Sequence, residues 1–225
     1  SLYTLNDVLS SYYSLPPTKF SIVPNGFDFD APYFKSLAYT NASIESHSIV
    51  YCGRLAWIKG VIFLIKAYSI LNKEVRDTKL KIIGWGPMGT HLKKLVSNLG
   101  LSKSVVFFGS VAREKAIQEM HTSDFLALPS LNEAGPVVVP EAMALRKPII
   151  AFNLPFVREF VLDNYNGLLA MPYDVKDFSD KMQTLLMDKN LTRKLGDNAY
   201  AYGKKEYDWA INVKKYMKIY DALVG

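Results

Sequence analysis

Short apolar runs alternate with longer amphipathic stretches through most of the chain, from residue 46 to residue 170. The runs are rich in Val, Ile and Phe and mostly lack strict apolar/polar alternation, which is typical of strands covered on both faces. Each intervening stretch suits one crossover helix between parallel strands. The pattern therefore predicts an α/β fold, a Rossmann-like doubly wound parallel sheet. Strands are expected at 48–52, 80–83, 105–108, 125–128, 148–152 and 167–170, and helices at 60–72, 87–99, 112–121, 137–146 and 155–163.

The two ends of the chain depart from this alternation. After residue 170 the pattern is wholly helical, with helices predicted at 174–188, 190–206 and 208–223. The first 45 residues carry a helical pattern near 4–14, then Pro16-Pro17 and the turn-rich Pro24-Asn25-Gly26, a cluster that marks a loop. We therefore expect three parts, which are the tail of a preceding domain at 1–23, the Rossmann-like domain at 24–205 and a C-terminal helix at 206–225.

The composition is that of a folded chain with a preference for anionic partners. Of the 225 residues, 49% are hydrophobic and 21% are charged, which is close to the average of globular proteins. The formal net charge of +6 favours nucleotides, nucleic acid or an acidic membrane surface. The nearest approach to a basic cluster is Lys204-Lys205 and Lys214-Lys215. A solvated basic face therefore explains the charge as well as a peripheral membrane contact does.

Cysteine and histidine usage argues against disulfides and metal sites. The single cysteine, Cys52, excludes an internal disulfide and indicates a reducing compartment, and its apolar neighbours predict a buried packing residue. His47, His91 and His121 lack the spacing of a zinc site. The chain has no apolar run of about 20 residues and no signal-peptide pattern, so we expect a cytoplasmic protein.

Two cations follow the first predicted strand directly. Gly53-Arg54-Leu55 and Lys59-Gly60 lie where, in an open α/β sheet, the carboxyl ends of strands meet the amino ends of helices and ligands bind. The arginine offers a fork of donors and the lysine a movable charge, so together they can straddle a diphosphate. The alternative is that both only solvate a loop.

A glycine-rich turn follows the second predicted strand. Gly84-Trp85-Gly86-Pro87-Met88-Gly89 satisfies GxGxxG, but the dinucleotide version also requires an acidic residue about 20 positions later. The next strand ends in Phe107-Phe108-Gly109-Ser110 without a carboxylate. NAD binding is therefore disfavoured, and the glycines alternatively serve only a tight turn.

Two carboxylates, Glu133 and Glu141, are separated by seven residues across a strand-to-helix connection. A carboxylate accepts from two neighbouring hydroxyls, so a ribose or hexose diol is a natural partner. Ala134-Gly135 can bring backbone N–H groups to an anion near the start of the next helix. The alternative is that both glutamates are only surface residues.

In this order, the motifs resemble the C-terminal domain of retaining GT-B glycosyltransferases of sequence family 4, the glycosyl transferases group 1. The resemblance covers roughly residues 20–200. The matching segments are Ile22 to Asp28, Gly53-Arg54-Leu55 with Lys59-Gly60, Ile83 to Pro87, Phe108 to Val111, Glu133 to Ala144, Lys147 to Ala151 and Asn166 to Leu169.

The resemblance implies a nucleotide-sugar site and a role for each motif. Arg54 and Lys59 would bind the donor diphosphate, Glu141 the ribose and Glu133 the sugar. Such enzymes transfer the sugar with retention, and the leaving diphosphate takes the acceptor proton, so the protein supplies positioning and charge stabilisation. The expected catalytic residues are Glu133, Arg54 and Lys59, and the expected donor-binding residues are Gly53, Arg54, Lys59, Gly84, Gly109, Ser110, Val111, Glu133, Ala134, Gly135, Pro136, Val137 and Glu141.

The resemblance also implies the partners. We expect a UDP-, GDP- or ADP-sugar as donor, no metal or other cofactor and no nucleic acid. An N-terminal domain would carry the acceptor site, and the helix at 206–225 would cross back to it. The chain departs from the family in having Ala134-Gly135-Pro136 where Gly-Phe-Gly is usual, and Pro140 is tolerated best in a first helical turn.

Other functions on the same fold stay open. A nucleotide-sugar epimerase would release an isomerised sugar without an acceptor, and a phosphorylase would need a lysine for pyridoxal phosphate that the sequence does not reveal. A non-catalytic nucleotide-binding module would not need Arg54, Lys59, Glu133 and Glu141 together. A glycoside hydrolase would need its two acids to face each other across a sugar.

Overall fold

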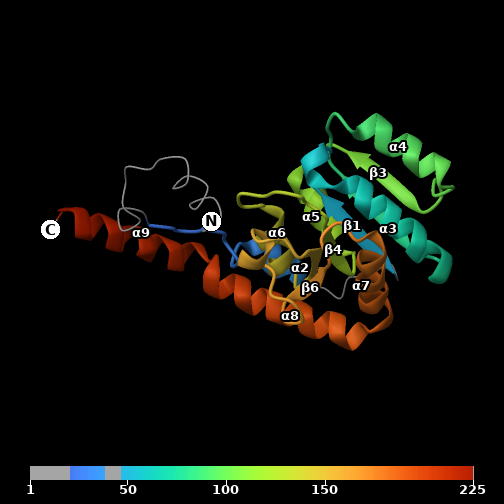
Figure 1. The fold of residues 1–225 in the computed structure, drawn as a ribbon. Coiled ribbons are helices and arrows are strands. Elements are labelled where there is room, and N and C mark those ends of the chain that lie inside the picture. The colour runs from blue at the N-terminus through green and yellow to red at the C-terminus, as the bar shows by residue number, and fades with distance from the viewer. Residues whose placement is uncertain (1–20, 39–46, 225) are drawn as a thin grey trace.

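The structure is a computed structural model that describes residues 21–38 and 47–224. The helix predicted at 4–14 lies outside these residues. The described part contains a six-stranded, all-parallel sheet with the order β3-β2-β1-β4-β5-β6 (Figure 1), which confirms the predicted doubly wound α/β fold. The strands are β1 (Ser48–Cys52), β2 (Lys79–Ile83), β3 (Val105–Gly109), β4 (Phe125–Leu128), β5 (Ile149–Phe152) and β6 (Gly167–Ala170).

Helices cover both faces of this sheet (Figure 1). One face packs against α3 (Val61–Glu74), α4 (Gly89–Asn98) and α7 (Val175–Met187). The other packs against α5 (Arg113–His121), α6 (Val138–Ala144), the short α2 (Pro32–Ala38) and α8 (Lys189–Glu206). Successive residues of β1 show the consequence, since Ile49 and Tyr51 join the first core and Val50 joins the second. A strand that is buried on both faces favours apolar residues at successive positions, which explains the mostly apolar runs. The buried Lys81 of β2 is an exception, and its Nζ lies 3.0 Å from the Glu119 carboxylate.

The helix predicted at 155–163 is wrong, because only the 3-10 turn η3 (Val157–Glu159) forms there. The fully buried Asn166 accounts for the difference. Its Oδ1 accepts from the backbone N–H of Leu162 at 2.7 Å, and its Nδ2 donates to the carbonyl of Phe160 at 3.1 Å. Both backbone groups are ones that a continuing helix would need. The helix predicted at 137–146 is also shorter, because Arg146 adopts the left-handed conformation at φ 55°.

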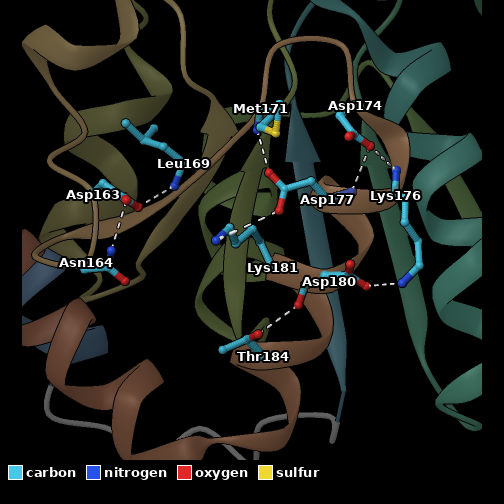
Figure 2. Close-up of polar contacts among 10 residues, drawn as sticks. All are labelled: Asp163, Asn164, Leu169, Met171, Asp174, Lys176, Asp177, Asp180, Lys181 and Thr184. Atoms are coloured by element: carbon cyan, nitrogen blue, oxygen red, sulfur yellow. Dashed lines mark hydrogen bonds and ion pairs between the residues drawn. The ribbon is translucent and has the colours of Figure 1, made fainter.

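Side-chain carboxylates fix the connections around β6 (Figure 2). Asp163 accepts from the backbone N–H of Leu169 at 2.8 Å, and Asp177 accepts from that of Met171 at 2.6 Å. Asp174 caps α7 by accepting from the backbone N–H groups of Lys176 and Asp177, two and three residues further along the chain. These bonds satisfy donors that the end of an edge strand and the start of a helix would leave open.

The C-terminal helix α9 (Trp209–Val224) forms as predicted and extends away from the sheet (Figure 1). It begins where two distant segments of the chain are tied together. The backbone N–H of Phe27 donates to the carbonyl of Tyr207 at 2.7 Å, and the N–H of Trp209 donates to the carbonyl of Phe27 at 2.9 Å. Beyond this junction, the Tyr216 and Tyr220 side chains are exposed. Among the described residues, no helix is long and apolar enough to cross a membrane.

Candidate functional site

Three glycines lie side by side at the carboxyl ends of neighbouring strands. Gly53 follows β1, Gly84 follows β2 and Gly109 ends β3. The N–H of Gly53 donates to the carbonyl of Ile83 at 3.0 Å, and the N–H of Gly84 donates to that of Gly109 at 2.8 Å. Gly84 adopts φ 131°, and a Cβ there would lie 1.9 Å from the carbonyl oxygen of Gly53. This close approach of two backbones requires glycine at position 84.

Arg54 has a fixed backbone and an exposed side chain. The hydroxyl of the buried Tyr51 donates to the Arg54 carbonyl at 2.9 Å, and the N–H of Leu55 donates to the carbonyl of Trp85 at 3.0 Å. Burial, followed by the charge of Glu133, raises the pKa of the Tyr51 hydroxyl, which therefore stays a donor. The Arg54 guanidinium is exposed and has no carboxylate partner within the described residues. It is thus available to an anion.

Lys59 and Glu133 form an ion pair above the end of the sheet. The Lys59 Nζ lies 2.7 Å from Glu133 Oε1, and the hydroxyl of Ser130 donates to the same oxygen at 2.7 Å. The Lys59 side chain is 25% exposed, whereas that of Glu133 is 8% exposed. The turn η2 (Trp57–Lys59) positions the lysine and ends at Gly60, which has φ 63°. Glu133 is therefore held from two sides, and Lys59 keeps access to solvent.

Glu141 lies in α6 and forms an ion pair with Arg113, a residue that was not predicted from the sequence. Arg113 Nε donates to Glu141 Oε1 at 2.8 Å. The Glu141 side chain is nearly buried, while that of Arg113 is mostly exposed. Pro140 is the third residue of α6, so it occupies the first helical turn as predicted. The orientation of the Glu141 side chain is thus set by Arg113, which lies 28 residues earlier in the sequence. The spacing of the motifs does not predict a pair at that separation.

The Lys59–Glu133 pair and the Arg113–Glu141 pair share no residue. The candidate site residues all lie near the carboxyl ends of the strands. They come from the ends of β1, β2 and β3, from the connection between β4 and α6, and from α6 itself. Of the predicted residues after β3, Ser110 is exposed and Val111 is half-buried. Ser130, which supports Glu133, was also missed, although it stands only three residues before it. No group of three or more metal-binding side chains occurs in the described ranges.

Cys52 lies at the end of β1 and packs against the second core as predicted, although it is partly buried and not fully enclosed. Burial, followed by the nearby charge of Glu141, raises the pKa of the Cys52 thiol to about 11. The thiolate is the reactive form of cysteine. The position beside Glu141 therefore keeps this thiol protonated next to the candidate site.

We expect Cys52 to be a slow nucleophile at neutral pH. A pKa near 11 in place of the ordinary 9.0 lowers the thiolate fraction at pH 8 about 100-fold. The rate of alkylation by iodoacetamide, measured from pH 7 to pH 11, should still rise about ninefold between pH 9 and pH 10, whereas a thiol with the ordinary pKa would gain only about twofold. The same thiol in urea-unfolded protein serves as the reference. A plateau near pH 9 in the folded protein would contradict the shift.

Comparison with known proteins agrees with this geometry. The family "Glycosyl transferases group 1" matches residues 40–202. The α-D-kanosaminyltransferase of Streptomyces kanamyceticus is 30% identical over 151 residues, which are 67% of this chain and 39% of that protein. A glycosyltransferase from Rickettsia africae has a similar structure, with a TM-score of 0.82 and 21% identity over 98% of this chain and 61% of its own.

A second similar structure is that of HepE from Anabaena in complex with UDP-glucose. Its TM-score is 0.75 at 22% identity, over 90% of this chain and 57% of its own. The chain thus spans about half the length of the curated relatives that it matches. The sheet order, the glycines at the strand ends and the family match lead to one conclusion, which is that the chain belongs to the glycosyl transferases group 1 and has the Rossmann-like fold of a GT-B C-terminal domain.

Proposed function

We propose that this chain binds the nucleotide-diphosphate sugar of a glycosyltransferase and that the sugar is a hexosyl group transferred with retention. The observation that carries the proposal is the ion pair of Lys59 with Glu133, together with the exposed Arg54, which follows the same strand as Lys59 and has no carboxylate partner within the described residues. Two cations at the carboxyl ends of parallel strands favour a diphosphate. The solvent-accessible Lys59 can turn toward that anion while Ser130 keeps Glu133 in place.

The proposed reaction needs no protein nucleophile. The acceptor hydroxyl oxygen forms a bond to the anomeric carbon on the face from which the diphosphate leaves. The bond between that carbon and the phosphate oxygen breaks, its electron pair goes to the diphosphate, and the acceptor proton passes to the same leaving group. Arg54 and Lys59 would stabilise the developing negative charge. Glu133 would orient the sugar by accepting from its hydroxyls.

We also propose that the reaction is independent of metal and that the acceptor is held partly by another domain. Two cationic side chains can supply the positive charge for which other transferases use a metal ion. The chain spans about half the length of its relatives, and this supports the proposal of a second domain. UDP is the first nucleotide to test, because the structurally similar HepE was solved with UDP-glucose.

The test is a calorimetric titration of the chain with UDP, GDP and ADP, each at moderate salt without added metal, followed by the sugar conjugate of the tightest binder. Selective binding of one diphosphate over its nucleoside would support a donor site. Equal affinity for diphosphate and nucleoside would contradict the roles of Arg54 and Lys59. Release of an isomerised sugar without an acceptor would favour an epimerase instead.

Glu141→Gln is expected to weaken binding of the selected diphosphate about tenfold, because a hydrogen bond to a charged acceptor contributes about 1.5–3 kcal/mol. The wild-type protein should also prefer the ribonucleotide to its 2′,3′-dideoxy analogue, and the variant should not. Both ligands would be titrated by calorimetry. Glu114→Gln, which makes the same charge change at an exposed position of α5, is the control. A retained preference in Glu141→Gln would place the ribose elsewhere.

A further inference from the structure

Trp57 and Tyr173 are large aromatic residues on the surface near the carboxyl end of the sheet. Trp57 belongs to η2, after β1, and is 60% exposed, whereas Tyr173 follows β6 and is 53% exposed. Both rings contact the half-buried ring of Phe63, whose centroid lies 6.4 Å from that of Trp57 and 6.0 Å from that of Tyr173. Behind them, the buried Phe152 ring lies 5.8 Å from that of Phe63. Trp57, Phe63 and Tyr173 therefore form one aromatic surface, which we call the aromatic platform.

The backbone of Tyr173 adopts a conformation that bulky residues rarely take. Its φ is 64°, in the left-handed region where glycine and asparagine are favoured. The loop is fixed on both sides of it. The N–H of Met171 donates to the Asp177 carboxylate at 2.6 Å (Figure 2), and the N–H of Asp174 donates to the carbonyl of Met171 at 3.1 Å. Since more than half of Tyr173 is exposed, burial of the ring does not account for this strained position, and such strain is typical of a binding position.

The backbone of Trp57 is fixed as well. Its carbonyl accepts from the N–H of Gly60 at 2.9 Å, and the carbonyl of the next residue, Ile58, accepts from the N–H of Leu131 at 2.8 Å. Trp and Tyr side chains have only two χ angles, so rings that are held by their neighbours lose little conformational entropy when a ligand covers them. The aromatic platform is thus a preorganised surface.

Both exposed rings keep a hydrogen-bond donor available. Neither the indole N–H of Trp57 nor the hydroxyl of Tyr173 bonds to another residue in the part of the chain that the structure describes. An aromatic ring with such a donor suits a ligand that has an apolar face and polar edges. The pyranose ring of a saccharide has this form, because its C–H bonds make an apolar face and its hydroxyls lie at the edge.

The exposed area of the two rings favours a small ligand over a protein. A large aromatic side chain buries about 150–250 Å² when it is fully covered, and Trp57 and Tyr173 are each little more than half exposed. A stable protein interface buries roughly 800 Å² on each partner, which is several times what the two rings offer. One or two sugar rings are enough to cover them.

The aromatic platform adjoins the candidate site without sharing a residue with it. Lys59 lies in the same turn, η2, as Trp57, whereas Tyr173 follows β6, which is three strands away from β1 in the sheet. At the usual spacing of about 4.8 Å between strands, this separation is about 14 Å. A chain of sugar rings can therefore extend from Lys59 and Glu133 across the aromatic platform.

We propose that the aromatic platform binds a saccharide and that one of its pyranose rings stacks on Trp57 and Tyr173. The choice of a saccharide rests on the proposed function, because a hexosyltransferase meets glycans as acceptors or products. No bond forms or breaks at the aromatic platform, which holds a ring that does not react.

The probes are maltotriose, cellotriose and chitotriose, because stacking on a C–H face depends little on which hexose supplies it. The chain has three tryptophans, so the nuclear magnetic resonance signals of their indole N–H groups report binding, and Trp57→Phe, Trp85→Phe and Trp209→Phe assign them. We expect at least one trisaccharide to shift the Trp57 signal with a Kd below about 10 mM, and the Trp85 and Trp209 signals to stay in place.

Tyr173→Asn tests the location, because asparagine accepts the left-handed conformation but lacks the ring. It should weaken trisaccharide binding at least fivefold while the Kd of UDP stays within twofold. Tyr165→Asn is the matched control, since Tyr165 is 43% exposed and lies before β6, at the opposite end of that strand. It should leave both affinities unchanged. Trp57→Ala should weaken trisaccharide binding as Tyr173→Asn does, and thermal unfolding checks that each variant is folded.

The outcomes separate this proposal from the proposed function. If UDP binds but no trisaccharide shifts the Trp57 signal, the aromatic platform is not a saccharide site and the donor site stands. Binding that Tyr173→Asn leaves unchanged would also overturn the platform, as would a Trp57 signal that moves only with protein concentration, which would indicate a contact between copies of the chain. If a trisaccharide binds in a Tyr173-dependent way and UDP does not bind, the platform stands and the proposed function falls.

Discussion

Replacing Arg54 with Ala is expected to lower kcat/KM for the nucleotide sugar about 10²–10³-fold, because preorganised charge at a leaving group commonly contributes this much. The Arg54 backbone is anchored by the Tyr51 hydroxyl, so the substitution removes the guanidinium without moving the turn. Affinity for UDP should fall at least tenfold, while affinity for uridine should stay within twofold. The measurements are release of nucleoside diphosphate and calorimetric titration of both ligands.

Arg76→Ala is the matched control for this variant. Arg76 is exposed and precedes β2, at the opposite edge of the sheet from the candidate site. The substitution makes the same change in net charge, so it also accounts for any long-range effect of charge on donor binding. Equal losses for uridine and UDP in Arg54→Ala would mean that the guanidinium does not meet the diphosphate.

Gly84→Ala is expected to lower the free energy of unfolding by about 3–5 kcal/mol, since it combines overpacking with a strained backbone. The added Cβ would lie 1.9 Å from the carbonyl oxygen of Gly53, and φ at this position is 131°. Either β1 or β2 must shift at its carboxyl end. Thermal unfolding should show a Tm lower by about 10 °C, and any folded fraction should bind UDP more weakly because the strand ends have moved.

Gly100→Ala separates the two contributions. Gly100 also has a left-handed conformation, with φ 70°, but no atom within 4 Å of an added Cβ. Only the backbone strain remains, so the loss in stability should be about 1 kcal/mol. If both variants lost the same amount of stability, the close approach of the Gly84 and Gly53 backbones would not be a constraint on the fold.

The sheet could be predicted from sequence because its strands are buried on both faces, which leaves a strong apolar signal in runs such as β1 and β5. The helix predicted at 155–163 failed because one buried side chain, Asn166, takes the backbone groups of Leu162 and Phe160. Apolar periodicity does not record such a competition between side chain and backbone. The short α2 was missed because it follows a turn-rich segment directly.

The residues of the candidate site could be predicted one by one, but the ion pairs between them could not. Position after a strand was enough to single out Arg54, Lys59 and Glu133. That Lys59 pairs with Glu133, and Arg113 with Glu141, depends on how the chain brings residues 74 and 28 positions apart together. No motif spacing carries that information.

Two backbone hydrogen bonds of Phe27, one to Tyr207 and one from Trp209, fix the point at which α9 begins. Trp209 also packs against Gly26, where a Cβ would lie 2.3 Å from its ring. Asn25, which precedes Gly26, lies near Gly135. Its Nδ2 is 3.8 Å from the position that a Cβ would take at Gly135. The start of α9 and the loop that carries Glu133 are therefore adjacent to the same short segment, Asn25 to Phe27.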